Sequence, residues 1–160
     1  MINQKQSVTK ALIVGLLLVA PALVSCQARE TESRSLRVVY QSQMCRIQES
    51  GLSLLKSVNE FEALLSSIQG LGAGAAPVVD FSSHIVAVVA AGQKPSAGFQ
   101  LRLVSNEAQL TEGLLTIDII IDEPGDMAAA MISSPCMLLS FERAGVDRIK
   151  LVNGESSIEI

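Results

Sequence analysis

The sequence has few aromatic residues and few basic ones. Its 160 residues contain no tryptophan, one tyrosine and four phenylalanines, and aromatic side chains make up 3% of the chain. Lys and Arg number 12 against 16 Asp and Glu, and the basic residues form no cluster. Nucleic-acid binding depends on a basic track along the phosphates or on aromatic side chains that stack on bases. We therefore expect no nucleic-acid partner.

Histidine and cysteine are also scarce. His84 is the single histidine, and the three cysteines, Cys26, Cys45 and Cys136, lie far apart in the sequence. A structural zinc site normally draws on closely spaced Cys and His ligands. The sequence predicts no metal site and no cofactor.

The first 25 residues have the pattern of an export signal. Lys5 and Lys10 precede an uncharged apolar run, ALIVGLLLVAPALVS. A basic segment followed by such a run is typical of a secretory signal peptide, and the run is short and proline-broken for a membrane span. The two lysines are the only charged residues of this leader, so its removal makes the chain more acidic than its full-length net charge of −4.

The end of this leader, Leu23-Val24-Ser25-Cys26, resembles the bacterial lipobox. In lipobox proteins the chain is cut before the cysteine, and the cysteine sulfur carries a diacylglycerol. Several acyl chains hold a protein firmly at a bilayer, since each buried CH₂ contributes about 0.8 kcal/mol. The resemblance implies cleavage after Ser25 and lipidation of Cys26. Gln27 is not the aspartate of lipoproteins retained at the inner membrane, which implies the outer membrane, facing the periplasm.

An ordinary cleaved signal with an incidental cysteine is the alternative for this leader. Either way the remaining cysteines, Cys45 and Cys136, are exported to an oxidising compartment, where a disulfide between them is the natural expectation. Two separate buried thiols are the alternative.

The exported part is long enough for one domain with one core. Residues 26–35 contain the anchor and a polar segment without periodicity, which predicts a flexible tether. Residues 36–152 form the predicted domain, and 153–160 a loose tail.

Within the domain, one helix and several strands are expected. Ser57-Val58-Asn59-Glu60 is a capping box, and apolar residues follow at helical spacing until Gly70. Alternating or continuous apolar runs predict strands, with Ala144-Gly145 as a hairpin turn between the last two. The predicted strands are 36–47, 85–91, 99–104, 114–122, 136–142 and 147–152. The predicted fold class is α+β, predominantly antiparallel β (sheet or sandwich) with one amphipathic helix.

The loop at 92–99, GQKPSAGF, interrupts this pattern and is the candidate binding site. Gly92 and Gly98 permit positive φ at its two ends, and Pro95 stiffens its middle. The order of residues is not that of a phosphate-binding loop. Either the loop is a rigid hairpin connection whose Phe99 fills the core, or its exposed Lys94 and Ser96 contact a partner.

No catalytic constellation is convincing. Ser53-Leu54-Leu55-Lys56 has the serine–lysine spacing of penicillin-recognising enzymes but lacks their companion motifs. Asp80, Ser82 and His84 are too close in sequence for one backbone to arrange them as the nucleophile, base and orienting carboxylate of a catalytic triad. The acidic residues Asp118, Asp122, Glu123 and Asp126 do not have the spacing of a calcium loop. We expect a protein that is not an enzyme.

Several of these segments together resemble the C-terminal domain of the PrcB family. That family shows a proline–x–x–Asp–Phe segment, an apolar strand, a glycine-framed loop, a Glu-x-Pro-Gly-like turn and a proline-led last strand. This chain has, in order, Pro77-Val78-Val79-Asp80-Phe81, the strand ending at Gly92, Lys94-Pro95-Ser96-Ala97-Gly98-Phe99, Glu123-Pro124-Gly125 and Ser134-Pro135. The resemblance covers roughly residues 45–152.

The chain departs from the family pattern at four positions. Ser96 replaces a threonine, Ala97 a glycine and Phe99 a tyrosine, and Cys136 follows the proline where an aromatic residue is common. The resemblance implies a non-catalytic, lipid-anchored interaction module of the cell envelope, with an exported protease as its partner.

Two alternatives to that function come from the same residues. The loop Lys94-Pro95-Ser96-Ala97-Gly98-Phe99 resembles the loop by which chagasin-type inhibitors enter cysteine proteases, which implies an inhibitor, although the chain has no second loop of that type and no tryptophan. A structural or small-ligand-binding lipoprotein is the other alternative.

Overall fold

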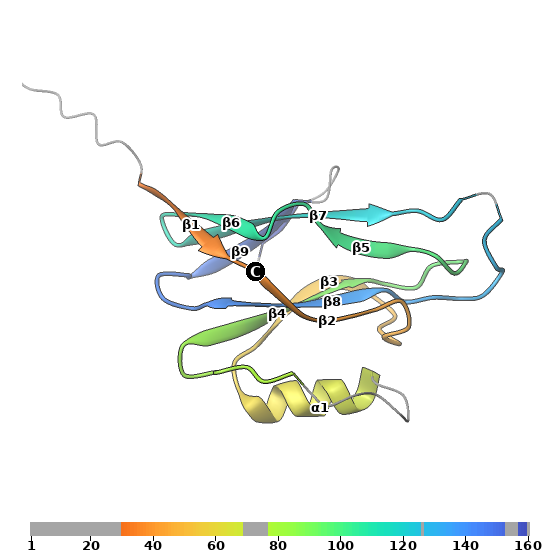
Figure 1. Ribbon diagram of the computed structural model, residues 1–160, viewed down its shortest axis with the longest axis horizontal. Coiled ribbons are helices and arrows are strands. Elements are labelled where there is room, and N and C mark those ends of the chain that lie inside the picture. The colour runs from red at the N-terminus through yellow and green to blue at the C-terminus, as the bar shows by residue number, and fades with distance from the viewer. Residues whose placement is uncertain (1–29, 69–76, 126, 153–156, 160) are drawn as a thin grey trace, which may run out of the picture.

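Two β-sheets and one helix are stacked in three layers, with the shorter sheet in the middle (Figure 1). The computed structural model describes residues 30–68, 77–125, 127–152 and 157–159. The central sheet has the order β2-β8-β4-β3, and each neighbouring pair is antiparallel. Its strands are β2 (Arg37–Ser42), β3 (Ser50–Leu55), β4 (His84–Ala91) and β8 (Cys136–Glu142).

The outer sheet has the order β1-β6-β7-β9-β10, and β5 pairs with the second half of β7. Strands β7 and β9 are parallel, and the other pairs of this sheet are antiparallel. Its strands are β1 (Thr31–Ser35), β5 (Gln100–Leu103), β6 (Glu107–Thr111), β7 (Leu114–Asp122), β9 (Arg148–Val152) and β10 (Ser157–Glu159). The predicted class, mostly antiparallel β with one helix, is confirmed, and the β-strands form a sandwich.

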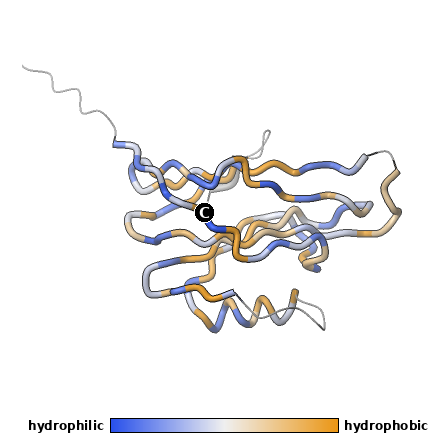
Figure 2. The backbone as a smooth tube through the Cα atoms, viewed as in Figure 1, coloured by the Kyte–Doolittle hydropathy of each residue, from blue (hydrophilic) through white to orange (hydrophobic). Residues whose placement is uncertain are grey.

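Strand β4 is buried on both faces, as its uninterrupted apolar run predicts. Ala87 and Val89 contribute to the core between the two sheets, while Val86 and Val88 contribute to the core beneath the helix. Strand β8 alternates in the same way. Figure 2 shows apolar segments running through the central sheet, between the other two layers. One sheet thus serves two cores, which lets a domain of this size build three layers.

Helix α1 (Val58–Ile68) begins at the predicted capping box. The amide of Glu60 donates to the Ser57 hydroxyl (3.3 Å). The Glu60 carboxylate accepts from the amide of Lys56 (2.7 Å), one residue earlier than the usual box. The buried stripe of the helix consists of Phe61, Leu65 and Ile68. The predicted stop at Gly70 lies outside the described residues.

The pairing of the last long strands differs from the prediction. Ala144-Gly145 was expected to join 136–142 and 147–152 as a hairpin, and this is wrong. Strand β8 belongs to the central sheet and β9 to the outer sheet, so the connection crosses between layers. Gly145 still turns the chain with a φ of 74°. An alternating apolar pattern fixes which face of a strand is buried, but not the sheet that the strand joins.

The chain also enters the domain earlier than predicted. Residues 31–35, assigned to the tether, form β1 and pair with β6. The predicted strand 36–47 is shorter, because the chain changes sheets at buried Leu36 and β2 ends at Ser42. Residues 157–159, within the predicted loose tail, form β10.

Cys45 and Cys136 form the predicted disulfide, with Cα atoms 5.8 Å apart and a sequence separation of 91. Both residues are buried in the core beneath α1. The bond ties the segment after β2 to the first residue of β8. The leader and Cys26 lie outside the described residues, and no helix among the described residues is long and apolar enough to cross a membrane.

Candidate functional site

The candidate loop 92–99 joins β4 of the central sheet to β5 of the outer sheet, so it is a connection between sheets and not a hairpin. Gly92 has φ 71°, and a Cβ there would lie 2.8 Å from the Ser50 amide nitrogen. Gly98 has φ 98°, and a Cβ there would lie 2.8 Å from Pro124. Both glycines are therefore required by backbone conformation and by close packing. They fix the two ends of the loop.

Backbone hydrogen bonds fix the middle of the loop to the segment that precedes β8. Lys94 and Ser133 exchange two of them, with N–H to carbonyl distances of 2.8 and 3.1 Å. The amide of Ala97 donates to the Ala129 carbonyl (3.0 Å). The buried Ser133 hydroxyl donates to the Ser96 carbonyl (2.7 Å). The loop is pre-ordered by its neighbour, so little conformational entropy remains to be lost on binding.

The loop side chains are partly buried, which corrects two expectations. Phe99 is half-buried beside the loop and does not fill the core. Lys94 and Ser96 are half-buried as well, whereas Pro95 is exposed. The Lys94 ammonium lies 5.7 Å from the centre of the Phe99 ring, within cation–π range. The family's tyrosine position thus carries a phenylalanine that packs under the lysine.

An open groove lies next to the loop, with a volume of about 590 Å³. It is bounded by the loop and by the connection between β7 and β8. The lining residues are Ala97, Gly98, Pro124, Gly125, Met127, Ala128 and Ala129. The lining is mostly apolar and made of small side chains, with Met127 fully exposed at the rim.

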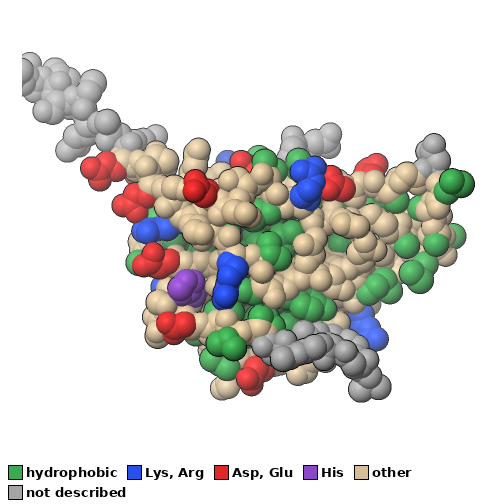
Figure 3. All heavy atoms as spheres, in the orientation of Figure 1, with side chains coloured by type: hydrophobic (Ala, Val, Ile, Leu, Met, Phe, Trp, Pro, Cys, Tyr) green, Lys and Arg blue, Asp and Glu red, His purple; other side chains and the backbone are tan. Residues whose placement is uncertain are grey.

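Exposed apolar side chains gather around this groove. Met131, Ile132 and Met44 are all exposed, and Met44 forms a β-bridge with Ser134. Figure 3 shows hydrophobic side chains at the edge of the molecule where Figure 1 places these connections. We call this region, residues 43–48, 92–99, 123–125 and 127–135, the loop end. Sequence analysis singled out its first half but missed Met127–Ile132, for which the apolar run MAAAMI between Gly125 and Ser133 was the available signal.

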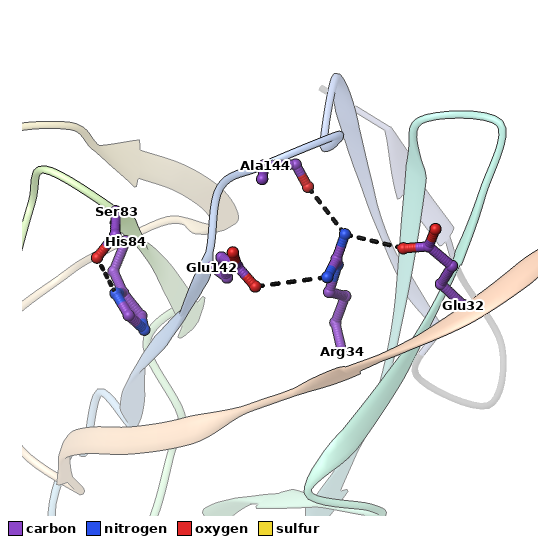
Figure 4. A network of polar contacts seen from close by, with 6 residues as sticks. All are labelled: Glu32, Arg34, Ser83, His84, Glu142 and Ala144. Atoms are coloured by element: carbon purple, nitrogen blue, oxygen red, sulfur yellow. Dashed lines mark hydrogen bonds and ion pairs between the residues drawn. The ribbon is translucent and has the colours of Figure 1, made fainter.

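The opposite end of the sandwich is polar and is organised by Arg34 of β1 (Figure 4). Its guanidinium forms ion pairs with Glu32 (2.9 Å) and with Glu142 at the end of β8 (3.4 Å). It also donates to the Ala144 carbonyl (3.2 Å) in the connection to β9. Arg34 therefore ties β1 to β8 and to the crossing connection. We call this region, around Arg34, Glu142 and His84, the anchor end, because the predicted lipid anchor lies N-terminal to β1.

Asp80, Ser82 and His84 do not form a catalytic line. Asp80 accepts from the amide and hydroxyl of Ser82 (3.0 and 2.6 Å) and from the Ser83 hydroxyl (2.9 Å). Ser83, not Ser82, contacts His84 Nδ1 (2.8 Å; Figure 4). The order is carboxylate–hydroxyl–imidazole, in which the Ser83 proton is directed to the Asp80 carboxylate and not to the imidazole of His84. The hydrogen bond from Ser82, followed by that from Ser83, lowers the pKa of Asp80.

The other candidate residues are spread over the surface. Ser53 lies within β3, and Lys56 lies between β3 and the helix. Asp122 accepts two hydrogen bonds from Arg102 (2.7 and 3.0 Å), which lower the pKa of the carboxyl. Asp118 is exposed on the outer sheet, and Asp126 lies outside the described residues. In the described part of the chain, no group of three or more Asp, Glu, His or Cys residues is arranged to hold a metal ion.

The comparison with protein families points to the same part of the molecule. Residues 85–142 match the family model described as PrcB C-terminal. The match runs from β4 to β8, so it contains the 92–99 loop and the β7–β8 connection, and it covers the middle of the segment 45–152 that resembles the family in sequence. No curated protein and no solved structure matched the chain. Over residues 85–142, this chain is similar to the PrcB C-terminal family.

Proposed function

We propose that this protein is a lipid-anchored, non-catalytic accessory subunit of an exported protease, which it contacts through its loop end. The observation that carries the proposal is the coincidence of the family match with the loop end: residues 85–142 contain the pre-ordered 92–99 loop and the exposed apolar segment Met127–Ile132. Exposed apolar clusters of this kind are typical of protein-binding surfaces.

The position of the anchor supports a partner away from the membrane. Thr31 pairs with Thr111, and Thr111 pairs with Leu114. Strands β1 and β7 therefore start at the same end of the outer sheet. The nine residues of β7 span roughly 27 Å at about 3.3 Å per residue. From Cys26 to Thr31 the chain can extend by at most about 17 Å. A lipid at Cys26 thus keeps the anchor end near the outer membrane and leaves the loop end free to extend into the periplasm.

The charge of the loop end also favours a protein over a lipid surface. Surfaces that bind anionic bilayers carry several Lys or Arg residues. In the sequence of 43–48, 92–99 and 123–135, the basic residues are Arg46 and Lys94, against Glu123 and Asp126, so the basic residues do not outnumber the acidic ones. We therefore propose that the loop end binds an apolar, largely uncharged segment of an exported protease.

A capture experiment with a charge variant tests the proposal. Lipidated protein serves as bait in native membranes, and mass spectrometry identifies what is retained. We expect one exported protease in near-stoichiometric amount, and Met127→Asp should abolish its capture while leaving the melting temperature unchanged. Val78→Asp, which adds the same charge at an exposed apolar residue outside the loop end, is the matched control. Equal loss of capture in both variants, or none in either, would remove the loop end from the proposal.

The inhibitor alternative makes a separate prediction. A chagasin-like protein inhibits a papain-type cysteine protease as the isolated soluble domain. Inhibition that Pro95→Gly weakens would support that function, whereas absence of inhibition at high protein concentration would eliminate it.

A further inference from the structure

The methionines of this chain are unevenly distributed. Besides Met1 of the predicted leader, the sequence has four. Met127, Met131 and Met44 all lie at the loop end, with 100%, 51% and 46% of their surface exposed. Met137, in β8, is 1% exposed within the core between the sheets. Exposed thioethers are thus concentrated on the surface that the proposed function assigns to docking.

The exposed methionines are also the side chains of the domain most open to oxidation. The chain has no tryptophan, and Cys45 and Cys136 are already joined in a buried disulfide. Tyr40 is half-buried. An oxidant that reaches the protein therefore meets Met127 first. Leucine or isoleucine would give a similar apolar surface without this reactivity, as Ile132 does in the same segment.

We propose that Met127, Met131 and Met44 form an oxidant-responsive site, in which conversion to methionine sulfoxide weakens docking at the loop end. Hydrogen peroxide supplies the oxygen atom and accepts the electrons. A lone pair of the thioether sulfur attacks one peroxide oxygen, the S–O bond forms and the O–O bond breaks. The departing hydroxide takes the proton of the transferred oxygen and leaves as water. Sulfur loses two electrons, and peroxide gains them.

Oxidation changes the chemistry of the surface without touching the fold. Sulfoxide is polar, so the loop end loses apolar area that a partner would bury. Full burial of one methionine side chain accounts for roughly tenfold or more in affinity. The core methionine, Met137, is shielded by its burial, and the backbone hydrogen bonds that order the loop involve no sulfur. Sulfoxide reductases reverse the modification, so the response is reversible. This consequence for docking rests on the proposed function.

The first experiment measures the site without any partner. The soluble Cys26→Ser protein is titrated with hydrogen peroxide, and oxidation at each methionine is followed by peptide mass mapping. We expect Met127 to react first, Met131 and Met44 next, and Met137 only after unfolding, with an unchanged melting temperature after the first three. Fluorescence of the dye bis-ANS, which reports exposed apolar surface, should fall as Met127 is consumed. Oxidation of Met137 in step with Met127, or dye binding that does not change, would overturn the site.

The second experiment measures docking. Capture of the protease by peroxide-treated bait should fall about tenfold or more and return after sulfoxide reductase treatment. The triple variant Met44→Leu, Met127→Leu, Met131→Leu is the matched control and should retain capture after peroxide. Undiminished capture by fully oxidised wild-type bait would overturn the inference while leaving the proposed function standing. Failure of untreated bait to capture any protease would instead contradict both the proposed function and the effect of oxidation on docking. The order in which the methionines oxidise is tested separately, by the mass mapping.

Discussion

The two ends of the sandwich are held together by different kinds of contact. At the anchor end, charged side chains join the strands: Arg34 reaches Glu32, Glu142 and the Ala144 carbonyl. At the loop end, backbone groups and a disulfide make the connections, as in the paired Lys94 and Ser133. Backbone pairing leaves side chains free for other uses. The loop end can therefore be ordered and still present apolar side chains to a partner, whereas the charged side chains of the anchor end are engaged within the domain.

The disulfide is the strongest test of this contrast. Replacing Cys45 and Cys136 with alanine should lower the free energy of unfolding by about 2–5 kcal/mol, because the bond closes a long loop of the unfolded chain. Chemical denaturation of the Cys26→Ser background measures the change. Thiol titration of the unfolded parent should find no free thiol, and two free thiols together with an unchanged denaturation midpoint would contradict the account.

Substitution of the loop glycines is expected to have the next largest effect on the free energy of unfolding. Gly92→Ala should cost about 1–3 kcal/mol, since it combines positive φ with a clash against the Ser50 backbone. Gly98→Ala should behave similarly against Pro124. Gly51→Ala is the matched control, because a Cβ there would meet nothing within 4 Å. Thermal denaturation of the three variants compares them, and equal melting temperatures would show that the loop is not fixed at its ends.

The anchor end should respond less and in a salt-dependent way. Arg34, with 22% of its side chain exposed, makes two ion pairs and one backbone contact, so Arg34→Met should cost about 1–2 kcal/mol at low salt. Arg102→Met removes the more exposed pair with Asp122 and should cost less than Arg34→Met, because solvent and salt screen an exposed ion pair. Denaturant titrations at two salt concentrations separate them. Equal costs for the two arginines would show that Arg34 does not clamp the anchor end.

The smallest expected effect is a pH dependence carried by two carboxyl groups, Asp80 near the anchor end and Asp122 in β7 of the outer sheet. Hydrogen bonds lower the pKa of Asp80, first from Ser82 and then from Ser83, and the bond from Arg102 lowers that of Asp122. Each contribution is therefore present above the ordinary aspartate pKa of about 3.9 and is lost as the pH falls through the lowered value. High salt should weaken the effect at Asp122, where the donor is charged, more than at Asp80, where the donors are neutral. Carboxyl NMR titrations at two salt concentrations measure both, and equal salt responses would contradict these causes.

Local patterns in the sequence were sufficient for helix α1 and for strand β4, but strand β3 (Ser50–Leu55) was not predicted. The capping box at Ser57 and the apolar run of β4 predicted a helix and a doubly buried strand, both of which are present. The disulfide followed from the expectation of export and from the number of remaining cysteines. The loop 92–99 was recognisable from its glycines and proline, because those residues have conformational meaning on their own.

What could not be predicted depends on long-range partners. Arg34 and Glu142 are 108 positions apart, and nothing near either residue indicates the other. The assignment of β9 to the outer sheet depends on parallel pairing with β7, which the alternation of β9 does not encode. The segment Met127–Ile132 was missed for a different reason: its apolar residues follow neither helical nor strand periodicity. An apolar run without periodicity in a connection was itself the sign of an exposed apolar surface.

Site-specific photo-crosslinking in intact cells tests the central claim, docking through the loop end, most directly. A photoreactive amino acid at position 127 is compared with the same residue at position 78, and the crosslinked product is identified by mass spectrometry. The account predicts that position 127 gives one crosslink to an exported protease and that position 78 does not. Crosslinks to the protease from position 78 but none from position 127 would contradict it.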